Sequence, residues 1–162
     1  MSRAYISISS NQGNPNAQVL QAFAELGSMP RSALIVCSSL YWSAPLGNED
    51  QPYFINAVAE IETTFNPYEL LSTMYQIEAV HGCTRGSRYG LNTMVLDLLL
   101  YDDLILAAEE LILPHPHIHE RAFMLLPLIE ISTNCQIPGY GLAKKCLANC
   151  HGQHVKLFKL LG

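Results

Sequence analysis

The sequence predicts an α+β domain in which two helices pack on one face of an antiparallel sheet. Two observations lead to this prediction. Segments with apolar residues at every second position alternate with segments whose apolar residues recur every three to four positions. Helix-capping and turn-forming residues separate these segments, which follow one another in the order β-α-β-β-α-β. This is the order of a split βαβ, or ferredoxin-like, sandwich, here with additional elements at the C-terminal end.

The first elements lie in the N-terminal quarter of the chain. Residues 4–9 place Ala or Ile at every second position, which predicts a strand. A helix is expected over 17–28, because apolar residues recur along one face and Gly27 marks its end. Residues 32–43 are predicted to form one continuous strand, followed by a loop rich in proline, glycine and acidic residues.

The second half of the unit begins with a strand at 53–64, which places Phe54 and Asn56 on the same face. A helix follows, with Asn66 as its N-cap and Pro67 at its first position. The remaining predictions are helix 66–82, loop 83–93, strand 94–103, a short strand and turn at 104–115, a helix or buried segment at 122–131 and a helix at 142–149.

Composition limits the kinds of partner. With 162 residues, of which 49% are hydrophobic and 14% charged, the chain can form one core, and we expect a single domain over 1–162. A net charge of −5 without a Lys/Arg stripe argues against nucleic acid. Neither a signal peptide nor an apolar run of about 20 residues is evident, so we expect a cytoplasmic protein without membrane contact. The oligomeric state stays open, with a monomer favoured.

The loop at 83–93 carries Arg85 and Arg88 and leads into a strand with Asp97 in its middle. Arginines can clamp phosphate oxygens, and a neighbouring carboxylate can hold Mg²⁺, so the pattern is typical of a nucleotide site. The alternative is a surface loop with solvated arginines and a structural Asp97.

Two other clusters contain metal-binding residue types. His115, His117 and His119 alternate, but the prolines between them argue against a regular strand, and contacts to phosphate or substrate beside Arg121 are favoured over a metal. The CxxxC at 146–150 lacks a second half-site, so free thiols are expected.

Phe54 and Asn56 suggest a site for a flat heterocycle, because a ring can stack while an amide reads the donors and acceptors of its edge. The alternative is that Phe54 belongs to the core and Asn56 ends a turn.

Four segments together resemble the 6-hydroxymethyl-7,8-dihydropterin pyrophosphokinase family of folate biosynthesis. They read ISISSNQGNP, SLYWSAPLGNEDQPYFINAV, RYGLNTMVLDLLLYDD and LPHPHIHERAFMLLPL, and the similarity covers about 4–131. The most specific block runs from Pro114 to Leu128. The resemblance implies a ferredoxin-like sandwich that transfers pyrophosphate from ATP to the pterin hydroxymethyl group and releases AMP.

The resemblance also implies roles for single residues. The pterin would stack between Phe54 and Phe123, with Asn56 reading its edge. The catalytic positions would be Arg88, Asp97 and Arg121, and Asp97 would be a ligand of two Mg²⁺ ions. The pterin pocket would be completed by Ser43, Ala44, Pro45 and Leu46. The ATP site would be lined by Glu78, Arg85, Arg88, Leu98, Ile112, His115 and Arg121.

The sequence departs from the family pattern where the metal and phosphates should bind. The pattern R-x-G-P-R-x-[aliphatic]-D-[aliphatic]-D places an aspartate where this chain has Val95 and an arginine where it has Asn92. Leu91, Cys83 and Ser9 replace proline, arginine and glycine. Losing a carboxylate weakens a Mg²⁺ site, and losing an arginine removes a charge partner of the transition state.

Two functions therefore remain open. The first is a pterin pyrophosphokinase with reduced activity and weakened Mg²⁺ binding, which uses ATP as co-substrate. The second is a catalytically impaired homologue that binds a pterin or a nucleotide. Both act on small molecules.

Overall fold

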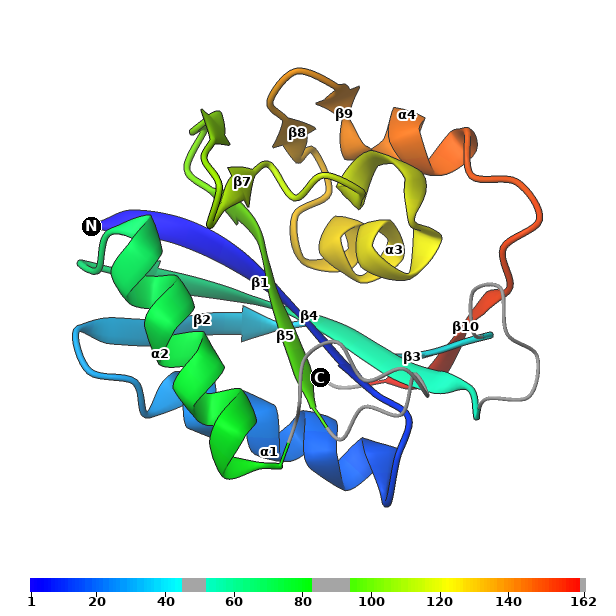
Figure 1. Ribbon diagram of the computed structural model, residues 1–162. Helices are drawn as coiled ribbons and strands as arrows, with labels where there is room; N and C mark the ends of the chain where they lie inside the picture. The colour runs from blue at the N-terminus through cyan, green and yellow to red at the C-terminus, as the bar shows by residue number, and fades with distance from the viewer. Residues whose placement is uncertain (45–51, 83–93, 161–162) are drawn as a thin grey trace.

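The computed structural model describes residues 1–44, 52–82 and 94–160, and shows a mixed α/β arrangement built on an antiparallel sheet (Figure 1). No helix within these residues is long and apolar enough to cross a membrane. The strands are β1 (Ser2–Ser10), β2 (Ser32–Cys37), β3 (Leu40–Ser43), β4 (Phe54–Thr63), β5 (Val95–Tyr101), β6 (Leu106–Ala107), β7 (Ile112–Leu113), β8 (Gln136–Ile137), β9 (Gly141–Leu142) and β10 (Val155–Lys159). The helices are α1 (Pro15–Gly27), α2 (Pro67–Val80), the 3₁₀ turn η1 (Ile118–Glu120), α3 (Ala122–Ile131) and α4 (Ala143–Ala148).

The main sheet has the strand order β10-β3-β4-β1-β5, and β2 also pairs with β4. All of these pairings are antiparallel. The longest is that of β1 with β4, which runs from Ser2 opposite Thr63 to Ser10 opposite Ile55. Because successive side chains of a strand point to opposite faces, this register fixes which residues of both strands share a face.

The prediction of one continuous strand over 32–43 is wrong, because the chain breaks at Ser38 and Ser39. The backbone N–H of Ser38 donates to the carbonyl of Val58, and the Ser38 hydroxyl accepts from the Val58 N–H. A side chain here takes the place of a backbone partner, so β2 and β3 pair with β4 as two separate strands.

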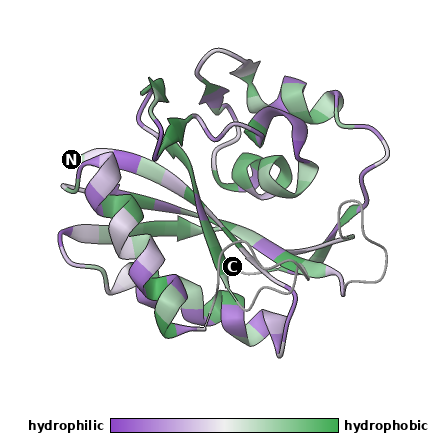
Figure 2. Ribbon diagram, in the orientation of Figure 1, coloured by the Kyte–Doolittle hydropathy of each residue, from purple (hydrophilic) through white to green (hydrophobic). Residues whose placement is uncertain are grey.

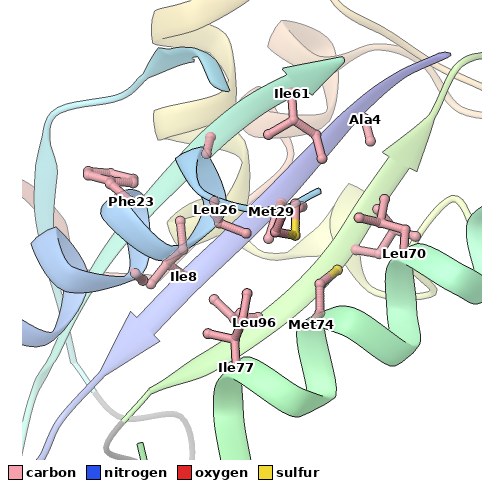
Figure 3. Close-up of a cluster of buried hydrophobic side chains, with 14 of the residues drawn as sticks. Ala4, Ile8, Phe23, Leu26, Met29, Ile61, Leu70, Met74, Ile77 and Leu96 are labelled. Carbon is pink, nitrogen blue, oxygen red and sulfur yellow. The ribbon is translucent and has the colours of Figure 1, made fainter. Parts of the chain in front are cut away.

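A first hydrophobic core lies between the sheet and the helix pair α1 and α2 (Figure 3). Ile8 of β1 and Leu96 of β5 face Leu26 of α1 and Met74 of α2, and all four side chains are almost completely buried. The N-cap prediction for α2 is confirmed: the Asn66 side chain accepts from the Glu69 N–H, and the Glu69 carboxylate accepts from the Asn66 N–H.

A second core covers the opposite face of the sheet, which the sequence did not predict to carry helices. Figure 1 shows α3 and α4 on this side. Val58 and Leu99 of the sheet pack with Met124, Leu125 and Leu128 of α3. In Figure 2, β5 is coloured as hydrophobic along most of its length, as expected for a strand that contacts apolar groups on both faces. The domain therefore has three layers, with the sheet in the middle.

Hydrogen bonds to Glu130 attach the end of α3 to the sheet. Its carboxylate accepts from the backbone N–H of Ser39 at 2.9 Å, from the Ser39 hydroxyl at 2.8 Å and from the Tyr41 hydroxyl at 2.6 Å. The break between β2 and β3 therefore supplies the donors that hold α3. Strand β10, which was not predicted, then extends the sheet beyond β3.

We expect Glu130→Ala to lower the free energy of unfolding by about 1–3 kcal/mol, because it leaves several donors without their acceptor. Urea unfolding followed by circular dichroism measures this change. Glu110→Ala, which removes an exposed carboxylate, is the matched control and should change stability by less than about 0.5 kcal/mol. Equal midpoints for both variants would contradict the proposed attachment of α3.

Stability should also fall at alkaline pH because of two tyrosines on this face. Burial, with a smaller contribution from the hydrogen bond to Glu60, raises the pKa of Tyr5 from 10.0 to about 12. Burial and the Glu130 carboxylate also raise the pKa of Tyr41. The folded state therefore holds these protons more tightly than the unfolded chain, so the stabilisation is complete below about pH 10 and is lost as pH rises towards 12.

We expect the urea midpoint of the wild type to fall above about pH 10, and Tyr5→Phe and Tyr41→Phe to fall less steeply. Tyr68→Phe, which changes an exposed tyrosine, is the control and should follow the wild type. Parallel curves for all four proteins would refute the role of Tyr5 and Tyr41.

Candidate active site

The candidate site lies on the face of the sheet that α3 covers in part. Ser7 and Ser9 of β1 point to this face, as do Phe54 and Asn56 of β4, because Ile6 and Ile8 point into the other core. On β5 the same face carries Asp97, which lies opposite Ser7. The prediction that Phe54 and Asn56 share a face is thus in accord with the strand register.

Asn56 is held by hydrogen bonds from three neighbouring residues. Its side-chain oxygen accepts from the Ser9 hydroxyl at 2.9 Å. Its side-chain nitrogen donates to the Ser43 hydroxyl at 2.7 Å and to the Tyr41 carbonyl at 3.4 Å. The residue is only 1% exposed. Since a carbonyl can only accept, the bond to Tyr41 fixes which end of the amide faces β3.

Two aromatic residues lie on the same side of the sheet as this amide. Phe54 precedes Asn56 by two residues on β4 and is half-buried. Phe123, in the first turn of α3, is also half-buried and packs at the margin of the second core. The guanidinium of Arg121 lies 5.8 Å from the centre of the Phe123 ring, which is within the range of a cation–π contact. The site therefore combines two partly accessible rings, one fixed amide and one cation.

The end of strand β3 supplies backbone groups at the rim of the site. Ser43 ends β3, and its neighbour Ala44 donates its N–H to the carbonyl of His154 at 3.3 Å. This bond links the rim of the site to the segment that leads into β10. Pro45 and Leu46, which were predicted to complete the pocket, lie outside the described residues.

A second part of the site is a pocket at the edge strand β5, with a volume of about 190 Å³. It brings together three residues predicted for the ATP site, Leu98, Ile112 and His115, with Asp97, which was predicted as a catalytic residue and metal ligand. His115 is fixed there by its backbone N–H, which donates to the Leu99 carbonyl at 2.9 Å. The other lining residues were not predicted from the sequence; they are Leu71, Tyr75, Leu96, Glu109, Glu110, Leu111 and Pro116.

Two of the missed residues are acidic. Glu109 and Glu110 follow a short hairpin strand, and both are exposed. Nothing in their local pattern distinguishes them from solvated surface acids, so only the fold of the β6–β7 hairpin could reveal that they border the pocket. Together with Asp97 they give this part of the pocket a negative charge, which a polyphosphate can approach only if cations offset it.

Glu78, also predicted for the ATP site, is buried in α2 at 2% exposure. Its carboxylate accepts from the backbone N–H of Leu96 at 2.7 Å. This bond anchors the start of β5 directly beside Asp97. In the described structure Glu78 thus helps to hold β5, the strand that carries Asp97.

The carboxylates on this face do not fit the two-ion Mg²⁺ site that the family resemblance implies. Val95, two residues before Asp97, points to the same face and carries no ligand atom, and Ser9 lies directly opposite it. Among the residues that the structure describes, no three His, Cys, Asp or Glu side chains gather in a way that could hold a metal ion. The buried hydroxyl of Ser7, opposite Asp97, has no hydrogen-bond partner within the described parts of the chain.

The three alternating histidines do not form a common site. The His117 N–H donates to Nδ1 of His115 at 3.1 Å, while the His117 ring bonds to Glu120 and lowers the pKa of that carboxylate. His119 instead stacks on Tyr140, with ring centres 4.1 Å apart. His119 also lies 3.9 Å from the Glu120 carboxylate, so the rings share some neighbours, but within the described residues the three histidines do not gather as metal ligands.

Cys146 and Cys150 are free thiols, as expected, and burial raises the pKa of both. Thiols of this kind are poor nucleophiles, because the reactive thiolate is disfavoured.

Several predicted site residues lie outside the described parts of the chain. Arg85 and Arg88 belong to this group, and so do the departures from the family pattern at Cys83, Leu91 and Asn92. Their roles stay predictions.

The similarity to known proteins is extensive. Residues 5–133 match the model of the family described as 7,8-dihydro-6-hydroxymethylpterin-pyrophosphokinase (HPPK). The chain is 40% identical over 138 residues to the 2-amino-4-hydroxy-6-hydroxymethyldihydropteridine pyrophosphokinase of Haemophilus influenzae, covering 85% of this chain and 86% of the relative. It is 43% identical over 128 residues to the enzyme of the same name from Bacillus subtilis, covering 79% of this chain and 77% of the relative.

Solved structures show the same fold at low sequence identity. A crystal structure of HPPK-DHPS in complex with substrates has a TM-score of 0.70 and 12% identity. The match covers 91% of this chain but only 43% of that longer chain. Taken with the match of the family model over residues 5–133, these similarities show that the chain belongs to the 7,8-dihydro-6-hydroxymethylpterin-pyrophosphokinase family.

Proposed function

We propose that this chain transfers pyrophosphate from ATP to 6-hydroxymethyl-7,8-dihydropterin, with lower turnover than its relatives. The observation that carries the proposal is the fixed amide of Asn56 on the side of the sheet that also carries the partly accessible rings of Phe54 and Phe123, together with a pocket at β5 lined by Asp97 and His115. A flat heterocycle fits the first part, and a nucleotide fits the second. The names of the curated relatives support the same reaction.

In the proposed reaction, the hydroxymethyl oxygen of the pterin attacks the β-phosphorus of ATP. The new O–P bond forms while the bond between the β-phosphorus and the bridging oxygen of the α-phosphate breaks. AMP leaves, and the hydroxyl proton passes to solvent. The protein contributes mainly by holding the two substrates in line, since positioning and charge stabilisation account for most catalysis of phosphoryl transfer.

Each part of the site has a proposed role. Phe54 and Phe123 stack on the pterin, Asn56 reads its edge, and Ser43 and Ala44 with Pro45 and Leu46 close the pocket. Glu78, Leu98, Ile112 and His115 line the nucleotide site. Arg85, Arg88 and Arg121 offset phosphate charge, and Asp97 is the remaining acid of the family's metal pair. Since Val95 leaves that pair incomplete, we assign no step to Mg²⁺.

The finer architectural predictions are proposals as well. We propose that β5-β1-β4-β2 with α1 and α2 corresponds to the ferredoxin-like core, and that 1–162 forms a single domain. A monomeric state and a cytoplasmic location stay predictions from the sequence.

A second candidate function is binding of a pterin or nucleotide without turnover. Val95 favours this candidate, because an apolar side chain stands where the family pattern has a metal-binding aspartate. The two candidates share the pterin pocket and differ only in whether AMP is formed.

We expect the purified protein to release AMP from ATP and Mg²⁺ when 6-hydroxymethyl-7,8-dihydropterin is present, at a rate above a blank without enzyme. Asp97→Asn should lower this rate by at least about tenfold, because it removes the remaining carboxylate of the pair. Chromatographic quantification of AMP gives the rate, and calorimetry gives the pterin affinity.

Asp103→Asn, in the exposed turn after β5, is the matched control and should leave the rate unchanged. If the protein binds the pterin but releases no more AMP than the blank, the second candidate function, binding without turnover, would be the correct one. Absence of both would overturn the proposed function.

Val95→Asp combined with Asn92→Arg should raise turnover by at least about tenfold, since an arginine at a transferring phosphoryl group alone can be worth far more than this. The gain should depend on Mg²⁺ concentration, because the second carboxylate adds oxygen ligands. Val80→Asp, at a highly exposed position, controls for the addition of a carboxylate outside the site. No gain in the double variant would mean that residues 92 and 95 do not occupy the catalytic positions.

A further inference from the structure

Ser9 connects the two halves of the proposed site. It lies at the centre of a row across the sheet, with Asn56 on β4 as its partner on one side and Val95 on β5 on the other. Directly opposite residues of neighbouring strands have Cβ atoms about 5 Å apart, so the Ser9 hydroxyl can reach a polar atom on either neighbour. In this structure it bonds to the Asn56 oxygen at 2.9 Å.

The hydrogen bonds of Asn56 define what a ligand can still use. Both hydrogens of its amide nitrogen point to acceptors, namely the Ser43 hydroxyl and the Tyr41 carbonyl. The residue can therefore recognise a ligand only by accepting, through its oxygen. That oxygen has two lone pairs, and Ser9 already occupies one of them.

We propose that Ser9 competes with the pterin for the amide oxygen of Asn56, and that Val95 permits this competition by offering Ser9 no other acceptor. The inference rests on the proposed function, because it concerns the affinity of that same pocket. An N–H of the ligand must share the Asn56 oxygen with Ser9 or displace it. Displacement breaks the hydrogen bond from the half-buried Ser9 to the amide oxygen, and the loss of this bond weakens binding.

Val95 determines whether the competition persists. Its side chain is apolar and half-buried, so the Ser9 hydroxyl gains nothing by turning towards β5. A carboxylate at this position would accept a charge-assisted hydrogen bond, which is about twice as strong as a bond to a neutral amide. Such a group would draw the hydroxyl away from Asn56 and leave the amide oxygen to the ligand. Residues 9 and 95 are thus coupled through one proton donor.

The test is a double-mutant cycle with pterin affinity as its readout, in the absence of ATP and Mg²⁺ so that turnover is not required. The dissociation constant of 6-hydroxymethyl-7,8-dihydropterin is measured by calorimetry for the wild type, Ser9→Ala, Val95→Asp and the double variant. We expect each single variant to bind about three- to tenfold more tightly than the wild type. The double variant should bind no more tightly than either single variant, because both changes free the same lone pair.

Two further variants test whether the change in affinity is due to the Ser9 hydroxyl itself. Ser9→Thr keeps the donor and should retain the weaker affinity of the wild type. Ser32→Ala removes another serine hydroxyl that bonds to β4, at Thr63 and far from Asn56, and should leave the affinity unchanged. Unchanged or weaker binding by Ser9→Ala, or gains that multiply in the double variant, would overturn the inference.

A ligand-free measurement distinguishes failure of this inference from failure of the proposed function. The side-chain amide resonances of Asn56 should shift in the NMR spectrum of Ser9→Ala and of Val95→Asp, but not in that of Ser32→Ala. If no variant binds the pterin, the proposed function fails, while these shifts still decide whether Ser9 holds the Asn56 oxygen. Absence of any shift in Ser9→Ala would refute the bond.

Discussion

The pairing of β1 with β4 determines where the side chains of the site stand. Nine consecutive residue pairs join the two strands, from Ser2 and Thr63 to Ser10 and Ile55. A slip by one residue would turn Ile6 and Ile8 out of the first core and Ser7 and Ser9 into it. Burial of the isoleucines therefore fixes the register, and this register brings Ser9 to Asn56. The hydrogen bond between Ser9 and Asn56 thus depends on the apolar face of the same strand.

The opposite face of the sheet depends on a local break in the strand pattern. Ser38 uses its side chain to pair with Val58, and Ser39 is then available to bond with Glu130 of α3. The helix held in this way presents Phe123 and Arg121 beside the sheet. A short irregular segment, remote in sequence from α3, therefore contributes to the position of the Phe123 ring.

Much of this arrangement could be predicted from the sequence where short-range patterns decide it. The N-cap at Asn66 depends on residues three apart, and the shared face of Phe54 and Asn56 depends on residues two apart. The break at Ser38 could not be predicted, because its cause is a partner 20 residues away on β4.

The same reason applies to the other features that were missed. Strand β10 forms only because β3 offers it an edge, and the second helical layer forms on a face of the sheet whose partners come late in the chain. In the pocket at β5, Glu109 and Glu110 have no local signal that separates them from surface acids. Their placement follows from the hairpin of β6 and β7, which no spacing in the sequence reveals.

The place of β10 has a consequence for the behaviour of shortened forms of the protein. The family match ends at residue 133, yet β10 (Val155–Lys159) covers the outer side of β3. A protein cut back to the matched region would expose the backbone donors and acceptors of Leu40–Ser43 along a free sheet edge, and such edges recruit strands from other molecules. In the full chain the outermost strand is β10, which carries Lys156 and Lys159. Charged side chains on an outermost strand disfavour pairing with strands of other molecules.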